Sequence, residues 1–290
     1  MESQRQLKEF DIIGVSLLYE LNFTNILTMF SLSQIPFYSR ERESAFPLII
    51  GGGPCSFNPE PLADFFDAFV IGDGEEVAVQ ISNKVIEFKQ QGDGQKKTLL
   101  KLLSKIDGVY VPSFFEPLYN QNGIQTLSPL FDDYKTVKRA FLPSLTKENF
   151  PDSPILPFAK PIHDRMRLEI ARGCSRGCRF CQAGMIYRPV RERSLEDLIE
   201  IAQASLKTTG HSDISLLSLS TGDYSNLPQL MERLLDLSQG YCNAISLPSI
   251  RAEKLTPELM NIIQKVRKTG FTIAPEAGTQ RLRDIINKNL

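Results

Sequence analysis

The stretch Arg167-Leu-Glu-Ile-Ala171-Arg-Gly-Cys174-Ser-Arg-Gly-Cys178-Arg-Phe-Cys181 joins a short apolar run to a loop with three cysteines. The apolar run is typical of a buried strand. A cubane iron–sulfur cluster is normally held by four cysteines, so three thiolates leave one iron open to a small molecule. The stretch therefore predicts a strand followed by a loop that binds such a cluster through Cys174, Cys178 and Cys181.

Other uses of these cysteines are less favoured. Structural zinc usually takes four ligands from paired motifs, but Cys55 and Cys242 are distant and His163 and His211 form no pair. Five cysteines, three of them clustered, also disfavour a disulfide framework. We expect Cys55 and Cys242 to be ordinary buried thiols.

The composition is that of a globular protein, with 290 residues, 42% hydrophobic and 23% charged residues, and a net charge of −1. No apolar run approaches the ~20 residues of a membrane span, so no membrane partner is expected. Residues 160–193 hold nine lysines and arginines against three acids. We favour the interpretation that this charge offsets an anionic cluster and binds a carboxylate; contact with RNA phosphates is the alternative.

Residues 1–92 form the first predicted domain, an α/β unit of the Rossmann-like, doubly wound type. Strands are expected over 11–17, 47–51 and 68–71, and helices over 21–33 and 75–90. Because nothing before Asp11 is typical of a strand, this domain is expected to be cut at its start.

Residues 93–165 are expected to be a connector. A loop is predicted over 92–97, a short helix over 98–105 and a hairpin turn at 121–123. The run 129–161 contains six prolines, which favour an ordered linker on the surface over a separate domain.

Residues 166–290 are predicted to be four βα units, which implies a truncated, partial (β/α) barrel. The expected strands are 167–171, 213–219, 243–247 and 271–274, and the expected helices are 195–208, 227–238, 257–268 and 279–287. Ser194 precedes one helix in a capping-box pattern, and Pro257 occupies the first position of another.

Polar residues follow the predicted strands of this barrel. They are Ser220, Thr221, Gly222 and Asp223 after the second strand, Ser249 and Arg251 after the third, and Glu276 and Arg281 after the fourth. In parallel α/β barrels the active site lies at the carboxyl ends of the strands. We therefore expect these residues to gather around the cysteine loop.

The cysteine spacing and the strand ends resemble the radical S-adenosylmethionine superfamily. The resemblance implies an enzyme whose 4Fe-4S cluster binds S-adenosylmethionine at the open iron. Reductive cleavage would give a 5′-deoxyadenosyl radical that acts on an unknown substrate. An electron donor such as flavodoxin or ferredoxin is also implied, and residues that act on the substrate are not assigned.

The resemblance gives roles to individual residues. Residues 220–223 match in part a Gly-Gly-Glu motif that binds the methionine amine, with Asp223 in place of the glutamate. Ser249 and Arg251 match contacts to the ribose and carboxylate, residues 276–281 match a segment beside the cofactor, and Phe180 would lie near the adenine. From the residues alone, Arg172 either balances the cluster's charge or pairs with Glu169.

The amino-terminal domain resembles the cobalamin-binding-type domain that precedes many such barrels. The residues that carry the resemblance are 14–18, 51–54, 58–61 and 71–76. No histidine occurs before His163, so this domain offers no histidine ligand to cobalt. Either cobalamin binds without one, or the domain has kept the fold and lost the vitamin, which we favour.

Three functions compete with the radical enzyme of unknown substrate. One is an iron–sulfur binding or redox-sensing scaffold without catalysis, and another is methyl or methylthio transfer to RNA or protein. Methylthiolating relatives carry three further cysteines for a second cluster, which this chain lacks. A zinc-bearing RNA-binding module is the third. An oxygen-labile cluster suits the reduced cytoplasm, where we expect the protein.

Overall fold

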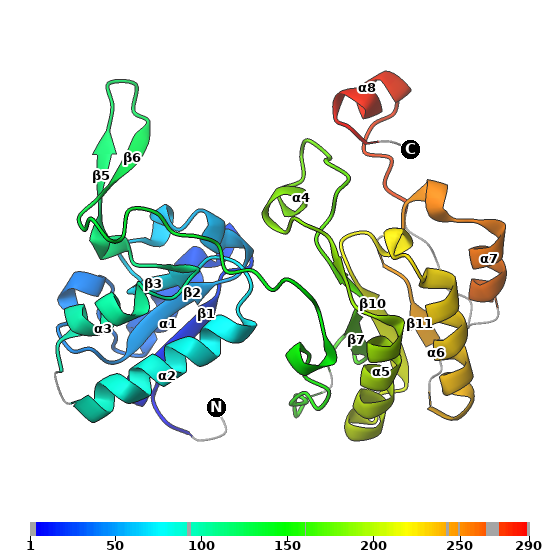
Figure 1. Ribbon diagram of the computed structural model, residues 1–290, viewed down its shortest axis with the longest axis horizontal. Helices are drawn as coiled ribbons and strands as arrows, with labels where there is room; N and C mark the ends of the chain where they lie inside the picture. The colour runs from blue at the N-terminus through cyan, green and yellow to red at the C-terminus, as the bar shows by residue number, and fades with distance from the viewer. Residues whose placement is uncertain are drawn as a thin grey trace. The chain divides into compact units, whose positions relative to one another are not determined.

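The computed structural model describes residues 4–91, 94–159, 161–241, 244–248, 250–264 and 273–288. The chain divides into two compact units, Met1–Leu142 and Pro143–Leu290, each of which combines helices and strands (Figure 1). The expected connector, 93–165, is shared between them, because a helix, a strand and a hairpin of this stretch lie in the first unit. None of the helices in the described part of the chain has the length and apolar character to cross a membrane.

A four-stranded sheet with the order β1-β2-β3-β4 forms the centre of the first unit. The strands β1 (Ile12–Ser16), β2 (Leu48–Gly52) and β3 (Ala68–Val70) are parallel, and β4 (Val109–Tyr110) is antiparallel to β3. The three parallel strands lie where the apolar runs predicted them. Strand β4 was not predicted, because two residues are too few to show a periodic pattern.

Helices cover both faces of this sheet. They are α1 (Phe23–Leu32), α2 (Glu75–Gln91) and α3 (Lys96–Leu103). Leu48 and Ile50 of β2 pack in the same core as α2 and α3, whereas Ile49 packs in the core of α1. Successive residues of β2 thus face opposite sides, and the first four are buried, which is typical of parallel strands between two helical layers.

The glycine- and acid-rich segments of the first unit have structural roles. A Cβ at Gly51 would lie 2.7 Å from Phe69 Cδ1 and 2.8 Å from Leu17 Cδ1, so the strands pack too closely there for a side chain. In the segment 71–76, Ile71 O accepts from Ala140 N at 2.9 Å, and Ala140 O accepts from the following turn at Asp73 N at 3.0 Å. Both segments therefore hold the first unit together.

A hairpin and several short helices complete the first unit. The hairpin is formed by β5 (Phe115–Tyr119) and β6 (Gln125–Pro129), and its turn lies where the sequence predicted one. The 3₁₀ turns of the first unit are Leu7–Glu9, Glu20–Asn22, Ser39–Glu41, Pro54–Phe57, Glu60–Leu62 and Pro112–Phe114. Helix α3 begins at Lys96, two residues before the predicted start at Thr98.

The second unit contains a parallel sheet with the order β11-β10-β7. Its strands are β7 (Met166–Glu169), β10 (Asp213–Leu217) and β11 (Ala244–Ser246), which matches three of the four predicted βα units. Of the fourth predicted strand, residues 271–272 lie outside the described residues, and residues 273–274 are not in a strand. The mixed α/β architecture with parallel sheets is confirmed.

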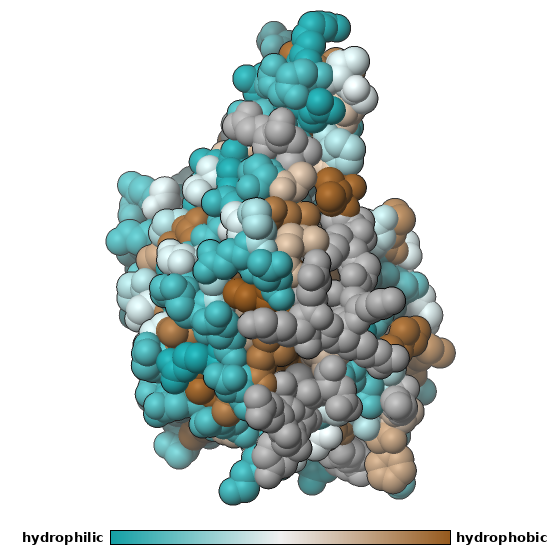
Figure 2. Space-filling view, turned by 90° about the vertical axis from the view of Figure 1, so that its right-hand side faces the viewer, coloured by the Kyte–Doolittle hydropathy of each residue, from teal (hydrophilic) through white to brown (hydrophobic). Residues whose placement is uncertain are grey.

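Three helices share a core with this sheet and bury its apolar residues, α5 (Leu195–Thr209), α6 (Leu227–Tyr241) and α7 (Pro257–Gln264). The described part of the unit also contains α4 (Ala183–Ile186), α8 (Gln280–Ile285) and 3₁₀ turns at Lys147–Asn149, Thr221–Asp223 and Ala252–Lys254. Helices α5, α6 and α7 lie side by side (Figure 1). Ser194 Oγ accepts from Asp197 N at 3.1 Å, which confirms the predicted cap of α5. On the face in Figure 2, hydrophobic residues lie among hydrophilic ones.

The two adjacent glycines of β2 allow a matched test of the packing. Gly51→Ala should destabilise the first unit by about 1–3 kcal/mol, because the new methyl group would overlap Phe69 and Leu17. Gly52→Ala should have little effect, because no described atom lies within 4 Å of the Cβ position. Hydrogen exchange of the β1–β3 amides measures both effects. Equal protection in the two variants would contradict the packing described.

Candidate functional site

The three cysteines lie on a loop whose two ends are paired. The loop leaves β8 (Ala171–Arg172) and returns at β9 (Arg191–Glu192), and the two short strands are antiparallel. Cys174, Cys178 and Cys181 are free thiols and are partly buried. Pairing of the ends limits the conformations open to the loop, so the three thiols are presented from one closed segment.

A glycine at the start of the loop allows its two arms to meet. Gly173 has φ of 95°, a conformation that favours glycine. A Cβ there would also collide with the backbone oxygens of Tyr187 and Pro189. Residue 173 must therefore be glycine for the cysteine loop to close as it does.

Beneath the loop, Glu169 at the end of β7 binds two arginines. Arg172 Nε and Nη2 donate to its carboxylate oxygens at 2.8 and 2.9 Å. Of the two predicted alternatives for Arg172, the structure therefore shows the pairing with Glu169. Arg193 Nη2 lies 3.5 Å from the same carboxylate, and Arg193 Nε donates to Glu169 O at 3.2 Å. The Arg193 side chain is completely buried, and this burial lowers its pKa.

A cavity of about 370 Å³ lies beside the cysteines, where the parallel strands of the second unit end. All three cysteines line it, together with Arg176, Phe180, Leu219, Ser220, Ile250, Arg251, Ala252, Ile273, Ala274 and Lys288. Segments after β8, β10 and β11 thus meet around one space. This is the arrangement expected for the active site of a parallel α/β barrel.

Three of the predicted cofactor-binding residues line this cavity, namely Phe180, Ser220 and Arg251. The Phe180 ring is 55% exposed, and Lys288 Nζ lies 6.0 Å from its centroid. Arg251 Nε donates to Glu253 Oε1 at 2.6 Å. The cavity therefore offers an aromatic face, a hydroxyl group and a held guanidinium group to a ligand.

Asp223 lies behind the cavity wall and binds the cysteine loop. Arg176 forms a two-bond ion pair with its carboxylate, with Nε at 2.7 Å from Oδ2. Ser220 Oγ donates to Oδ2 at 2.7 Å, and Lys254 Nζ lies 3.3 Å from Oδ1. The bonds from Arg176 lower the pKa of Asp223 to about 2, against the effect of burial, with Ser220 and Lys254 contributing.

The other predicted residues lie around the cavity or away from it. Thr221 is fully buried and its Oγ1 lies 3.0 Å from Ser218 Oγ, while a Cβ at Gly222 would lie 2.7 Å from Lys254 Cβ. Glu276 Oε1 lies 3.3 Å from Lys288 Nζ, and Arg281 is exposed on α8; neither lines the cavity. Ser249 lies outside the described residues.

Several residues of the site were not predicted from the sequence. Asn287 Nδ2 donates to Gly177 O at 2.8 Å and to Arg176 O at 3.1 Å, and Arg179 N donates to Ile286 O at 3.0 Å. The end of α8 therefore packs on the cysteine loop across more than a hundred residues of sequence. Arg176 could have been found from the positive charge of the loop, but nothing local indicates Asn287.

The donor set fits a cluster better than a single metal ion. In the described part of the chain, no three Cys, His, Asp or Glu side chains converge closely enough to hold one ion. A zinc ion needs thiolates about 2.3 Å from a single point, whereas a cubane offers a separate iron to each cysteine. Three cysteines spread around one cavity therefore suit a 4Fe-4S cluster whose fourth iron has no ligand from the protein.

The fold and site define a two-unit α/β protein whose second unit carries a three-cysteine cavity at its strand ends. The family model of the radical SAM superfamily matches residues 168–290, and the model of the amino-terminal region of radical SAM proteins matches residues 1–112. The chain belongs to the radical SAM superfamily, as the cysteine spacing predicted.

Relatives match different shares of the chain. The uncharacterized protein MJ0966 of Methanocaldococcus jannaschii is 30% identical over 293 residues, which cover 100% of this chain and 55% of that protein. The ribosomal protein uS12 methylthiotransferase RimO of Elusimicrobium minutum is 26% identical over 177 residues, 59% of this chain and 40% of the relative. The chain thus spans about half the length of the relatives that it matches, or less.

Two solved structures share the fold. The cobalamin-dependent S-adenosylmethionine radical enzyme OxsB superposes with a TM-score of 0.57 at 15% identity, over 97% of this chain and 37% of that one. The radical S-adenosylmethionine methyltransferase TsrM from Kitasatospora setae gives a TM-score of 0.56 at 14% identity, over 97% and 51%. At such low identity the likeness shows the fold alone.

Removal of the shared carboxylate should loosen the base of the cysteine loop. Glu169→Ala should destabilise the second unit by about 3–5 kcal/mol, because buried Arg193 would lose its anionic partner. Glu200→Ala is the control, since its partner Lys147 is exposed and such pairs contribute little. Urea unfolding compares the two variants. A loss no greater for Glu169→Ala than for Glu200→Ala would refute this role.

The low pKa of Asp223 predicts a pH window for its ion pair. Because the folded pKa of about 2 is below the ordinary 3.8, the ionised carboxylate stabilises the second unit at pH values above about 4. This contribution, on the order of 1–2 kcal/mol, is lost as the pH falls from about 4 to about 2.

The window can be measured by comparing unfolding free energies of the wild type and Asp223→Asn across this pH range. Their difference should shrink toward pH 2. Asp236→Asn, at an exposed aspartate of α6, is the control for the loss of a surface carboxylate. A difference for Asp223→Asn that stays constant with pH would show that the ion pair does not stabilise the fold.

Proposed function

We propose that this chain is a radical S-adenosylmethionine enzyme that holds a 4Fe-4S cluster through Cys174, Cys178 and Cys181. When bound, the cluster and S-adenosylmethionine supply a 5′-deoxyadenosyl radical, which abstracts hydrogen from a substrate. One observation carries the proposal. The three cysteines line the same cavity as Ser220 and Arg251, at the ends of parallel strands.

The cavity residues would orient S-adenosylmethionine. Arg251 would bind the carboxylate of the methionine, because a guanidinium group matches the geometry of a carboxylate. Ser220 would accept from the amine, and Asp223 would orient the Ser220 hydroxyl that already donates to it. Phe180 would pack near the adenine. These roles are supported by the position of each side chain in or beside the cavity.

Residues behind the wall would fix its shape. Thr221 and Gly222 would hold the turn that carries Ser220, since one is fully buried and the other packs against Lys254. We assign Ser249, Glu276 and Arg281 to the binding of S-adenosylmethionine only because the sequence resembles the family at these positions. The apolar residues Leu219 and Ile250 of the wall would exclude water from the reacting atoms.

The names of the relatives support a second candidate function. The names of two relatives specify methylthio transfer, to ribosomal protein uS12 for RimO and to tRNA for MtaB of Bacillus subtilis, which is 29% identical over 110 residues. Transfer of a methyl or methylthio group to RNA or protein is therefore our second candidate function. We propose a flavodoxin or ferredoxin as electron donor and the cytoplasm as location.

Cobalamin is a candidate cofactor of the first unit. Solved structures of OxsB and TsrM contain bound cobalamin. In this chain no histidine precedes His163, so cobalt would have no histidine ligand from the first unit. Gly52 and Gly74 have no described atom within 4 Å of their Cβ positions, so packing within the unit does not require glycine at either position.

Cluster assembly tests the proposal with a matched pair of cysteine variants. Anaerobic reconstitution should give about four irons per chain, and S-adenosylmethionine with a reductant should then yield 5′-deoxyadenosine. Cys178→Ala should lose both the iron and the product. Cys55→Ala should keep both, because Cys55 is buried in the core of the first unit.

The same measurements separate the rival functions. A full complement of iron in Cys178→Ala would contradict the assignment of the ligands. A wild-type cluster that never cleaves S-adenosylmethionine would favour the redox-sensing scaffold over the enzyme. Binding of one zinc ion in place of four irons would favour the zinc module.

A further inference from the structure

The first unit contains a second cavity, of about 530 Å³, that the proposed function does not use. It lies at the amino end of β3, because Phe66 lines it and Asp67, which directly precedes β3, bonds to three of its lining residues. Its walls come from the 3₁₀ turn at Ser39–Glu41, the start of α3 and the base of the β5–β6 hairpin. This is the edge opposite the carboxyl ends of the parallel strands.

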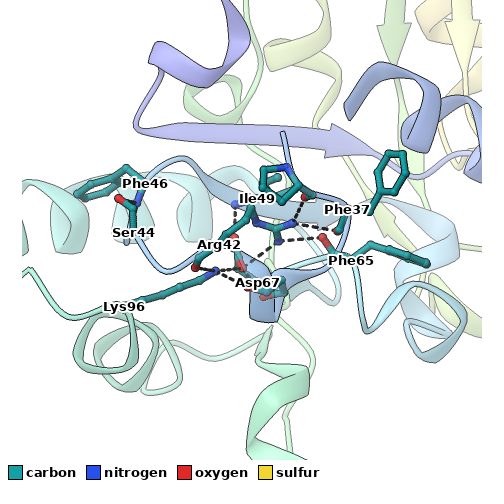
Figure 3. Close-up of polar contacts among 10 residues, drawn as sticks. Phe37, Arg42, Ser44, Phe46, Ile49, Phe65, Asp67 and Lys96 are labelled. Atoms are coloured by element: carbon teal, nitrogen blue, oxygen red, sulfur yellow. Dashed lines mark hydrogen bonds and ion pairs between the residues drawn. The ribbon is translucent and has the colours of Figure 1, made fainter. Parts of the chain in front are cut away.

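Two cations of this cavity, buried Arg42 and partly buried Lys96, share one carboxylate (Figure 3). Arg42 Nη2 lies 3.0 Å from Asp67 Oδ1, and Lys96 Nζ lies 2.5 Å from the same oxygen. The other oxygen of Asp67 accepts from Ile49 N at 2.8 Å, and Ser39 Oγ also donates to Oδ1 at 2.5 Å. Both oxygens of the Asp67 carboxylate are thus hydrogen-bonded. Its single negative charge balances only one of the two cations, so one positive charge remains.

Arg42 and Lys96 both show the effects of this excess. The Arg42 side chain is 4% exposed, and its Nε has no hydrogen-bond partner among the described residues. Burial lowers the pKa of Lys96, opposed by Asp67 and assisted by Arg42. The other donors of these two side chains have partners: Arg42 Nη1 and Nη2 donate to the carbonyl oxygens of Pro36, Phe37 and Phe65, and Lys96 Nζ donates to those of Ser39 and Arg42. An anion in the cavity would therefore interact with both cations through their charge.

The start of α3 adds to the same positive field. Its first turn carries Lys96 and Lys97 and no acid, and its N-cap residue Gln95 makes no side-chain cap. Cations at this end oppose the helix dipole, which favours anions. Exposed Arg40 also lines the cavity, so four basic side chains surround it on two segments.

The rest of the lining is mainly apolar and aromatic. Phe66, Phe114, Phe115 and Phe131 contribute rings, and the carboxylate of Glu60 is already bound by Tyr110 and Gln125 at 2.5 and 2.8 Å. Exposed Asp64 is the other acid of the lining. The cavity therefore combines a cationic wall with a broad apolar surface.

We propose that this cavity binds a small organic phosphate. The phosphate group faces exposed Lys97 and Arg40, Arg42 and Lys96 add positive charge behind them, and a flat apolar body lies against the phenylalanines. The cavity is lined only by residues of the first unit, so the proposal does not depend on the cluster or on S-adenosylmethionine.

Titration calorimetry of the full chain with phenyl phosphate tests the proposal. Inorganic phosphate and phenol, each of which carries only one half of phenyl phosphate, are partial probes measured at the same ionic strength. Phenyl phosphate should bind at one site and more tightly than either partial probe. Lys97→Ala should weaken this binding about tenfold through loss of a charge-assisted contact. Lys101→Ala should stay within about twofold, as a distant surface charge acts only through screened attraction.

Lys97 and Lys101 form a matched pair. Both are exposed on α3 and lie over the ring of Phe131, at 5.7 and 5.0 Å, but only Lys97 lines the cavity. Absence of saturable binding of phenyl phosphate would overturn the proposal. Equal losses in the two variants, no loss in Lys97→Ala, or equal affinity for inorganic phosphate would overturn it as well.

Discussion

The carboxylate of Glu169 is the interaction on which the geometry of the second unit depends. It ends the strand β7, binds Arg172 at the start of the cysteine loop, and lies beside buried Arg193 just after the loop returns. A buried guanidinium group needs an anion and acceptors to compensate for lost hydration. Glu169 meets this need and thereby fixes both ends of the loop to the sheet.

The position of the site follows from that anchor. Once the loop is held at the end of β7, parallel pairing with β10 and β11 brings the following segments to the same edge. Arg176 then connects the loop to Asp223 after β10, and Asn287 connects it to the end of α8. Arg176 thus both lines the cavity and holds the loop, so a ligand that contacts Arg176 would also bear on the position of the loop.

Much of the fold could be predicted from the sequence because burial leaves a periodic pattern. The apolar runs of β1, β2 and β3 were found in this way, the Ser194 cap was found from its capping-box pattern, and the spacing of the cysteines indicated the family. Contacts between distant segments leave no such pattern. The ion pair of Arg176 with Asp223 and the bonds from Asn287 depend on how the elements pack, so the sequence predicted Asp223 but not its partner.

Two motifs show how a sequence signal can have more than one cause. The glycines at 51–53 and the segment 71–76 suggested a cofactor domain, yet Gly51 is required by the close approach of Phe69. The backbone of Ile71 and Asp73 pairs with Ala140. The first unit's signature is thus partly explained by its own packing, whatever it binds.

The central claim is that S-adenosylmethionine binds an open iron beside Cys174, Cys178 and Cys181. Electron paramagnetic resonance of the reduced, reconstituted protein, with and without S-adenosylmethionine, tests it most directly. The account predicts a reduced 4Fe-4S signal that changes when S-adenosylmethionine is added. A cluster signal that is identical in its presence and absence would contradict the account.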